Sequence, residues 1–245
     1  NFTLNINRIK KILNAILKDN PKITWDTPNG VRADFLDDEI LRKSKESGCV
    51  YLIIGVESGE RAVLDDIIKK KLSLKAVDKA ARISKEVKLN LEAFFVIGFP
   101  GETLRNMIST IAYAHRLQFK YGAYPTIFIA TPLPGTRLYE TCLAKGYIKE
   151  DFSYSRIPSS ILREGMIETE DFDLLDIKRL SVYFRIMRDA LTVINFLKFC
   201  LSSPIFIVKK FAYLFKIFFL SPKRVRFSHK TFLRNLIRYN FYIGV

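Results

Sequence analysis

Short apolar segments alternate with amphipathic helical patterns over the first 145 residues, and this alternation restricts the fold more than any other feature. Residues 50–56, 92–97 and 125–130 are apolar runs of strand length. Helical periodicity is found between and around them, over residues 9–17, 39–46, 73–87, 103–114 and 137–145. Strands that are separated by single helices and short connections form parallel sheets wound in one hand. The sequence therefore predicts an α/β fold with a parallel sheet or barrel.

Local signals define where these elements begin and end. Asp37 or Asp38 can cap the helix that follows, and Gly48 fits the left-handed position that ends it. Thr103 is placed in the same way before a later helix. The continuous apolar character of residues 50–56 is typical of a strand buried on both faces.

Glycine, proline and small polar residues gather after the predicted strands, where parallel α/β folds place their chemistry. Four such segments occur, at residues 29–34, 55–59, 98–103 and 131–136. Glycine lets the backbone approach a flat ligand, and carboxylates and hydroxyls can bind sugar hydroxyls. We therefore expect these strand ends to form a concave face that suits a nucleoside.

The same segments carry four ordered motifs. They read W-x6-R-x-D-x-L-D from Trp25, G-C-x-x-L-x-I-G-V-E-S-G from Gly48, F-x-I-G-F-P-G-E-T from Phe95 and T-P-L-P-G-T-x-L-Y from Thr131. In this order the motifs resemble the radical S-adenosylmethionine (SAM) superfamily, and within it the methylthiotransferases and cobalamin-binding enzymes. Four motifs in sequence are far more specific than any one of them.

The resemblance implies the C-terminal portion of a partial (β/α)6 barrel. It also implies that SAM binds a [4Fe-4S] cluster and is cleaved to a 5′-deoxyadenosyl radical, for methyl transfer or related chemistry on an unactivated carbon. The substrate would be a lipid, a tetrapyrrole or another small molecule, and no catalytic residue is assigned. By the same likeness Arg32 lies near the cofactor carboxylate, and Glu57 and Ser58 contact the ribose or methionyl groups. The residues implied around the adenine are Gly98, Gly101, Glu102, Thr131 and Pro132.

One departure from the family is severe, because the cluster-binding C-x-x-x-C-x-x-C loop is absent from the sequence. Cys49, Cys142 and Cys200 are too far apart to replace it. The opening Phe2-Thr3 resembles the end of the family's D-D-x-F-T motif, which favours a fragment of a longer enzyme over a protein that lost its cluster and kept the fold. The resemblance also allows a cobalamin-binding domain upstream.

The site residues have simpler interpretations. Arg32 could form a surface ion pair with Asp34 or Asp38. Glu57 could be the charge before the next helix, with Ser58 as its cap. Only the conjunction of the motifs favours cofactor binding over these readings.

The C-terminal part has a different composition. The net charge is +15, and after Asp189 the chain has ten Lys or Arg and no acidic residue. We therefore divide the chain into a partial barrel (1–150), a linker and helix (151–189) and a basic, aromatic helical tail (190–245). Residues 205–220 have a wide apolar helical face with lysines on one narrow side, which fits either a cap packed on the barrel or a helix in a membrane interface.

Membrane contact is favoured for residues 223–238, because they are basic and would meet anionic lipid. Nucleic acid is not expected, since the apolar face of residues 205–220 is wider than a phosphate-tracking helix needs. No secretory signal is evident, and no apolar run reaches the ~18 residues of a membrane span. We expect a cytoplasmic protein that contacts a membrane peripherally through its tail.

Overall fold

The computed structural model describes residues 2–19, 22–148, 161 and 165–202. The chain divides into two compact units, Asn1–Arg188 and Asp189–Val245. The sheet and all of the predicted site residues belong to the first unit. The tail predictions for residues 205–220 and 223–238 lie outside the described residues.

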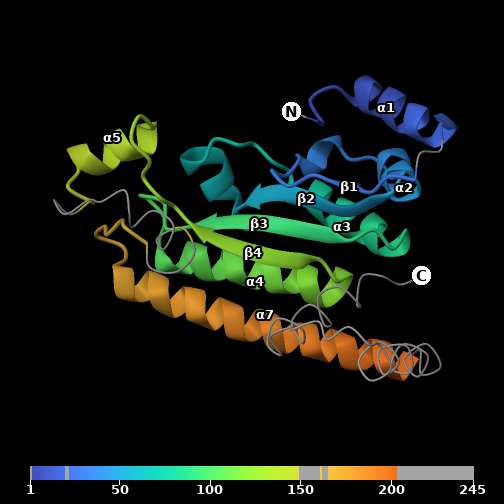
Figure 1. The fold of residues 1–245 in the computed structure, drawn as a ribbon. Helices are drawn as coiled ribbons and strands as arrows, with labels where there is room; N and C mark the ends of the chain where they lie inside the picture. Colours follow the sequence, from blue (N-terminus) through green and yellow to red (C-terminus); the bar gives the residue numbers. More distant parts are fainter. Residues whose placement is uncertain (1, 20–21, 149–160, 162–164, 203–245) are drawn as a thin grey trace, which may run out of the picture. The chain divides into compact units, whose positions relative to one another are not determined.

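The first unit is built on a parallel sheet of four strands in the order β1-β2-β3-β4 (Figure 1). The strands are β1 (Trp25–Asp26), β2 (Cys49–Glu57), β3 (Leu91–Ile97) and β4 (Tyr124–Ile129). Successive strands are joined through α2 (Asp38–Glu46), α3 (Leu74–Glu86) and α4 (Leu104–Tyr121). The predicted parallel α/β fold is therefore confirmed.

Three further helices complete the description. They are α1 (Ile6–Asp19), α5 (Arg137–Ala144) and α7 (Leu174–Ser202). Two short segments are a 3-10 turn at Ala33–Phe35 and a π-helical turn at Val63–Ile67. The helix α7 continues past residue 190, the predicted start of the tail, so the change in composition lies within an element, one residue from the boundary between the two units.

The predicted helix caps are present. The Asp37 side chain accepts a hydrogen bond from the Ile40 amide at the start of α2, and Gly48 after this helix has φ +91°. Thr103 forms a reciprocal capping box with Asn106 at the start of α4. These caps fix the points at which the chain leaves each loop for a helix.

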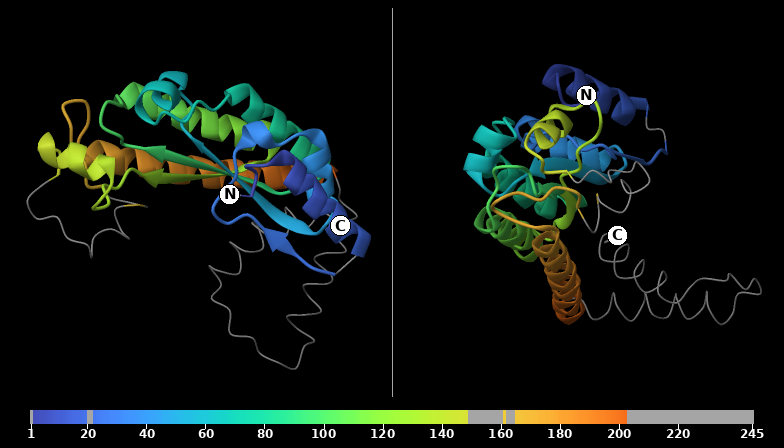
Figure 2. Two further views of the ribbon diagram at one scale, coloured as in Figure 1. Left: turned by 90° about the horizontal axis from the view of Figure 1, so that it is seen from above. Right: turned by 90° about the vertical axis from the view of Figure 1, so that its left-hand side faces the viewer.

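One face of the sheet is covered by helices, and α3 and α4 pack beside each other in both views of Figure 2. Phe95 and Ile97 of β3 are fully buried on this face. Residues on the opposite face are only partly buried, among them Phe94, Val96 and Phe128. Val50 in β2 is 39% exposed, so the prediction of a strand covered on both faces along residues 50–56 was wrong at this position.

The first part of α7 packs on α4. Phe184 is buried and its ring stacks on His115 at 5.2 Å between centroids. The Gln118 side-chain amide donates to the backbone carbonyl of Arg188 at 2.8 Å. None of the helices in the described ranges is both long and apolar enough to cross a membrane.

Candidate functional site

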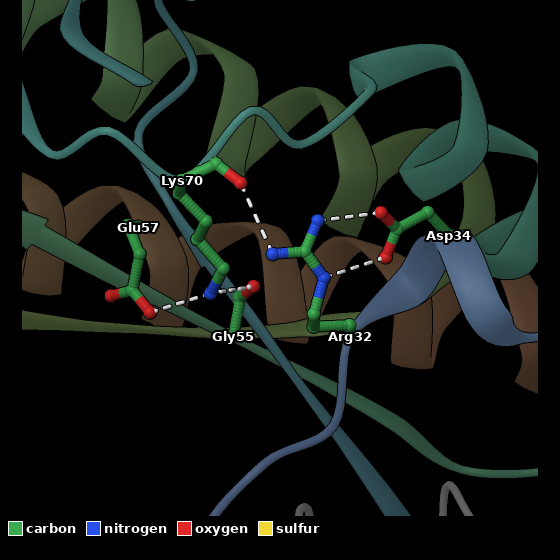
Figure 3. Close-up of polar contacts among 5 residues, drawn as sticks. All are labelled: Arg32, Asp34, Gly55, Glu57 and Lys70. Carbon is green, nitrogen blue, oxygen red and sulfur yellow. Dashed lines mark hydrogen bonds and ion pairs between the residues drawn. The ribbon is translucent and has the colours of Figure 1, made fainter. Parts of the chain in front are cut away.

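A polar cluster lies at the carboxyl end of β2 (Figure 3). The Lys70 ammonium donates to the Gly55 backbone carbonyl at 2.7 Å and to Glu57 Oε1 at 2.8 Å. The side chains of Lys70 and Glu57 are 17% and 26% exposed, so the ion pair is shielded from water without being fully buried. Lys70 comes from the loop after the π-helical turn, thirteen residues further along the chain. We refer to Arg32, Gly55, Glu57 and Lys70 as the β2-end cluster.

Arg32 joins this cluster from the segment that runs alongside β2. Its guanidinium holds the Asp34 carboxylate through two hydrogen bonds, from Nε at 3.1 Å and from Nη2 at 2.6 Å. The pKa of Arg32 is raised above its ordinary value, first by this hydrogen bond to Asp34. Nη1 donates to the backbone carbonyl of Lys70 at 3.1 Å. Arg32 therefore contacts the loop from which the Lys70 side chain extends. The ion pair that the sequence allowed for Arg32 is thus present, with Asp34 as its partner.

The backbone is strained around the cluster. Glu57, Lys69 and Lys71 have φ values of +71°, +59° and +51°, which L-residues with side chains rarely adopt. The pairing of β2 with β3 shifts register between Gly55 and Glu57, as in a β-bulge. Left-handed residues and bulges are enriched at functional sites, where surrounding contacts maintain the strain.

Gly55 is required by its position in this arrangement. A Cβ atom there would lie 3.0 Å from Lys70 Nζ and 3.1 Å from Glu57 Oε1. Gly30 is equally constrained, with φ +75° and a Cβ position 3.3 Å from the Gly55 nitrogen. The two glycines therefore let the segment before Arg32 approach the end of β2.

An open hollow of about 570 Å³ lies beside this segment. It is lined by Phe2, by Trp25 and by the residues that follow to Val31. Val31 pairs with the backbone of β2 at Ile54 and is followed in the chain by Arg32, but the members of the β2-end cluster are not among the residues that line the hollow. Its volume lies within the range of pockets that bind cofactors and drug-sized ligands.

The end of β3 is arranged differently. Glu102 is 0% exposed, and its Oε2 accepts hydrogen bonds from the backbone amides of Gly98 and Phe99, both at 2.8 Å. Its Oε1 is buried without a hydrogen-bond partner. Burial raises the pKa of Glu102 to about 7, although the two amide donors favour the charged form. The Glu102 side chain thus stabilises the turn that contains it, through its hydrogen bonds from Gly98 and Phe99.

Of the remaining predicted site residues, Ser58 is buried inside the protein, and Thr131 and Pro132 lie after the end of a strand. The Ser58 hydroxyl is buried, lies 2.9 Å from Thr110 Oγ1 and accepts from the Glu60 amide, as the capping interpretation allowed. Thr131 and Pro132 follow β4, and Thr131 donates to the Ile129 carbonyl at 3.1 Å.

The backbone ends of β3 and β4 adjoin through a bond from the Ala130 amide to the Ile97 carbonyl at 2.8 Å. This brings Gly98 and Gly101, which have φ +88° and +91°, to the same edge of the sheet as Thr131. The predicted residues therefore share one edge, and Lys70 is the member that the sequence motifs did not reveal.

The described residues do not fit an iron–sulfur cluster. They contain no group of three or more His, Cys, Asp or Glu that could hold a metal ion. Burial raises the pKa of the Cys49 thiol to about 12 and that of Cys142 to about 11, so both stay protonated at neutral pH. Cluster iron binds thiolates, and neither side chain supplies one here.

The parallel sheet and its polar strand ends define an α/β protein of the class whose ligand sites lie at the carboxyl ends of the strands. Residues 1–114 match the family model of the Radical SAM superfamily, so this part of the chain is a radical SAM domain. It is 28% identical over 141 residues to cytidylyl-2-hydroxyethylphosphonate methyltransferase of Streptomyces wedmorensis, covering 55% of this chain and 26% of the relative.

An uncharacterized methyltransferase of Pyrococcus horikoshii is 32% identical over 147 residues, which cover 60% of this chain and 31% of the relative. This chain thus spans about a third or less of the length of both relatives. Among solved structures, coproporphyrinogen III oxidase (HemN) of Escherichia coli, a radical SAM enzyme, matches with a TM-score of 0.49 and 14% identity. That match covers 76% of this chain and 38% of the HemN chain.

Proposed function

We propose that this chain supplies the SAM-binding part of a radical SAM methyltransferase. The single observation that carries the proposal is the strained β2-end cluster, which lies in the segment that matches the superfamily. The residues that line the open hollow directly precede Arg32 of this cluster in the chain. When bound beside a [4Fe-4S] cluster, SAM supplies the radical chemistry that defines the superfamily. The cluster ligands would come from outside this sequence, because it contains no C-x-x-x-C-x-x-C loop.

The cluster residues have complementary roles toward such a cofactor. Arg32 uses three of its five N–H donors internally, and the other two can bind the cofactor's carboxylate. Lys70 holds Glu57 by Oε1, which leaves Oε2 to accept hydrogen bonds from ribose hydroxyls. Because Glu57 is held by both its backbone conformation and Lys70, its carboxylate is already oriented before the ligand arrives.

The end of β3 would complete the adenine side. Gly98 and Gly101 carry no side chains of their own, and Glu102 fixes the loop from within. Ile177 of α7 and Ile67 lie 3.1 Å and 3.6 Å from the positions that a Cβ atom would take at Gly98 and Gly101. Thr131 and Pro132 adjoin this loop at the end of β4 and would close the adenine pocket. Ser58 would act indirectly, by fixing the backbone next to Glu57 through Thr110.

Methyl transfer to an unactivated carbon of a small molecule or lipid is the reaction we propose, on the basis of the two methyltransferase relatives. A cobalamin cofactor, bound by a domain outside this sequence, belongs to the same proposal. A second candidate is a SAM-binding module without catalytic activity, and the lack of a metal-binding group among the described residues favours it. Anaerobic reconstitution with iron and sulfide distinguishes the two when this chain is joined to a segment that carries a C-x-x-x-C-x-x-C loop, because only the enzyme part would then cleave SAM reductively.

The cofactor proposal is tested by measuring SAM affinity with isothermal titration calorimetry and, for weak binding, saturation-transfer NMR. Arg32→Ala and Glu57→Gln should each lower the affinity about tenfold or more, because each removes a hydrogen bond that involves a charged group. Arg82→Ala is the matched control, since Arg82 pairs with Glu86 on the surface of α3. Equal affinities for the wild type and both site variants would refute the proposal.

A further inference from the structure

The helix α7 carries an exposed apolar stripe on the side opposite to its packed face. Besides Tyr183, six large apolar side chains between residues 182 and 201 are at least 40% exposed. They are Val182, Ile186, Val193, Ile194, Leu197 and Leu201. At about 100° per residue these positions fall within an arc of about 120°. We call these six residues the α7 stripe.

The packed face of the same helix points the other way. Ile177 and Phe184 are 1% and 2% exposed, and Phe184 stacks on His115 of α4. By helical spacing these buried positions lie about 140° to 160° from the centre of the α7 stripe. A surface helix normally presents polar residues opposite its buried face, so the stripe requires a second apolar environment.

Charged side chains are excluded from the arc of the stripe. Between residues 182 and 201 the charged residues are Arg185, Arg188, Asp189 and Lys198, and by helical spacing all four fall outside the arc. Twenty residues of α-helix span about 30 Å, so the stripe is a continuous apolar strip rather than a few scattered side chains.

The charge of the chain indicates what covers the stripe. From residue 190 to residue 245 the sequence contains ten Lys or Arg and no Asp or Glu. The first unit is itself basic, with thirty Lys or Arg against twenty-four Asp or Glu, so a second copy of this chain offers no excess of negative charge to these ten cations. An anionic lipid surface offers both the apolar depth and the negative charge.

We propose that α7 binds the surface of an anionic membrane peripherally, through the α7 stripe, and that the basic residues after Asp189 supply the second, electrostatic signal. Stable attachment to a bilayer surface requires two such signals, because a single apolar contact gives only marginal binding. This inference does not depend on the proposed cofactor. It assigns a lipid-binding role to a described helix, in addition to the membrane contact expected for the tail.

Liposome flotation of the full chain tests the proposal. The wild type should float with vesicles of phosphatidylglycerol and phosphatidylcholine and stay unbound with phosphatidylcholine alone. Raising the salt concentration should release a large part of the bound protein, because the electrostatic contribution is screened.

A neutral triple variant, Val193→Gln with Leu197→Gln and Leu201→Gln, removes apolar area from the α7 stripe without changing the charge. It should lower the partition coefficient about tenfold or more. Ile108→Gln on α4 is the matched control, because Ile108 and Leu197 are both 54% exposed. This control should float like the wild type, and circular dichroism should show the same thermal unfolding for all three proteins.

Three results would overturn the proposal. The first is a wild type that does not float with anionic vesicles, and the second is a triple variant that floats as well as the wild type. The third is a wild type that sediments as a dimer without lipid while the triple variant sediments as a monomer, which would assign the stripe to a contact between two copies.

Discussion

The ends of β2 and β3 carry the same kind of residue in opposite environments. Glu57 follows β2 with a side chain 26% exposed, a φ of +71° and the ammonium of Lys70 as its partner. Glu102 follows β3 with a side chain fully buried and only backbone amides as its partners. One carboxylate is held at the surface by a strained backbone, and the other is used to close a loop.

The difference teaches that a glutamate in a strand-end motif does not by itself identify a ligand contact. Glu102 stabilises the turn that brings Gly98 to the edge of the sheet, so its effect on a ligand is indirect. Glu57 has little role in packing, and its strained conformation needs a functional reason. Variants of the two glutamates should therefore separate stability from binding.

The largest effect is expected for Glu102→Ala at pH 5, where Glu102 is neutral. Loss of the carboxyl leaves the buried amides of Gly98 and Phe99 without an acceptor, which should lower the free energy of unfolding by about 4 kcal/mol. Urea denaturation measures it. Glu57→Ala is the control, with an expected loss below about 1 kcal/mol because its ion pair is partly exposed. Similar losses of unfolding free energy in Glu102→Ala and Glu57→Ala would contradict the difference proposed between the two strand ends.

The next effect is a pH dependence that arises from Glu102. Its pKa is raised in the folded state from 4.5 to about 7, so the folded protein binds more protons than the unfolded chain between these values. The associated stability is fully present below pH 4.5 and is lost as the pH rises through 7, with a total of about 3 kcal/mol.

The pH effect is measured as a difference between the wild type and Glu102→Gln, which does not titrate. Between pH 5 and pH 8 the wild type should lose about 3 kcal/mol relative to the variant, while contributions from other groups cancel. Parallel pH profiles of the two proteins would show that Glu102 titrates normally.

A smaller effect is expected for Lys70→Met. The variant removes donors to the Gly55 carbonyl and to Glu57, which should cost about 1.5 kcal/mol of stability and weaken SAM binding by releasing Glu57. Lys71→Met in the same loop is the control and should change neither quantity, because Lys71 is exposed. If the two methionine variants behave alike, the ion pair does not organise the end of β2.

The smallest effect concerns the strain at Glu57. Glycine tolerates a positive φ and alanine does not, so Glu57→Gly should be more stable than Glu57→Ala by about 1 kcal/mol. At Glu86 in α3 the order should be reversed, because glycine is unfavourable in a helix. Thermal unfolding of the four variants measures both differences, and the same order at both positions would show that Glu57 is unstrained.

The sequence was sufficient to predict the architecture of the first unit. Apolar runs, helical periodicity and the caps at Asp37 and Thr103 all depend on neighbouring residues, and each was found as expected. The Arg32–Asp34 pair is also local, since the two residues are two positions apart. Such features follow from short-range physical chemistry, and the motifs lie at the carboxyl edge of the sheet, while their role in cofactor binding stays a prediction.

The orientation of individual side chains, and the contacts between residues far apart in the sequence, could not be predicted in the same way. The Lys70 contact joins residues thirteen positions apart through a loop with left-handed residues, for which the sequence offers no periodic signal. The inward orientation of Glu102 and Ser58 depends on the packing of the loops against α4 and the strand ends. The exposure of the α7 stripe likewise depends on which face of the helix meets α4.

The central claim, that the carboxyl end of β2 binds the cofactor, is tested most directly by NMR. Titration of the labelled chain with SAM should shift the amide signals of Gly30, Arg32, Gly55 and Glu57 together, with smaller shifts at Gly98. The same titration of Glu57→Gln should leave these signals nearly unchanged. Absence of shifts in the wild type, or shifts confined to α1 and α5, would contradict the account.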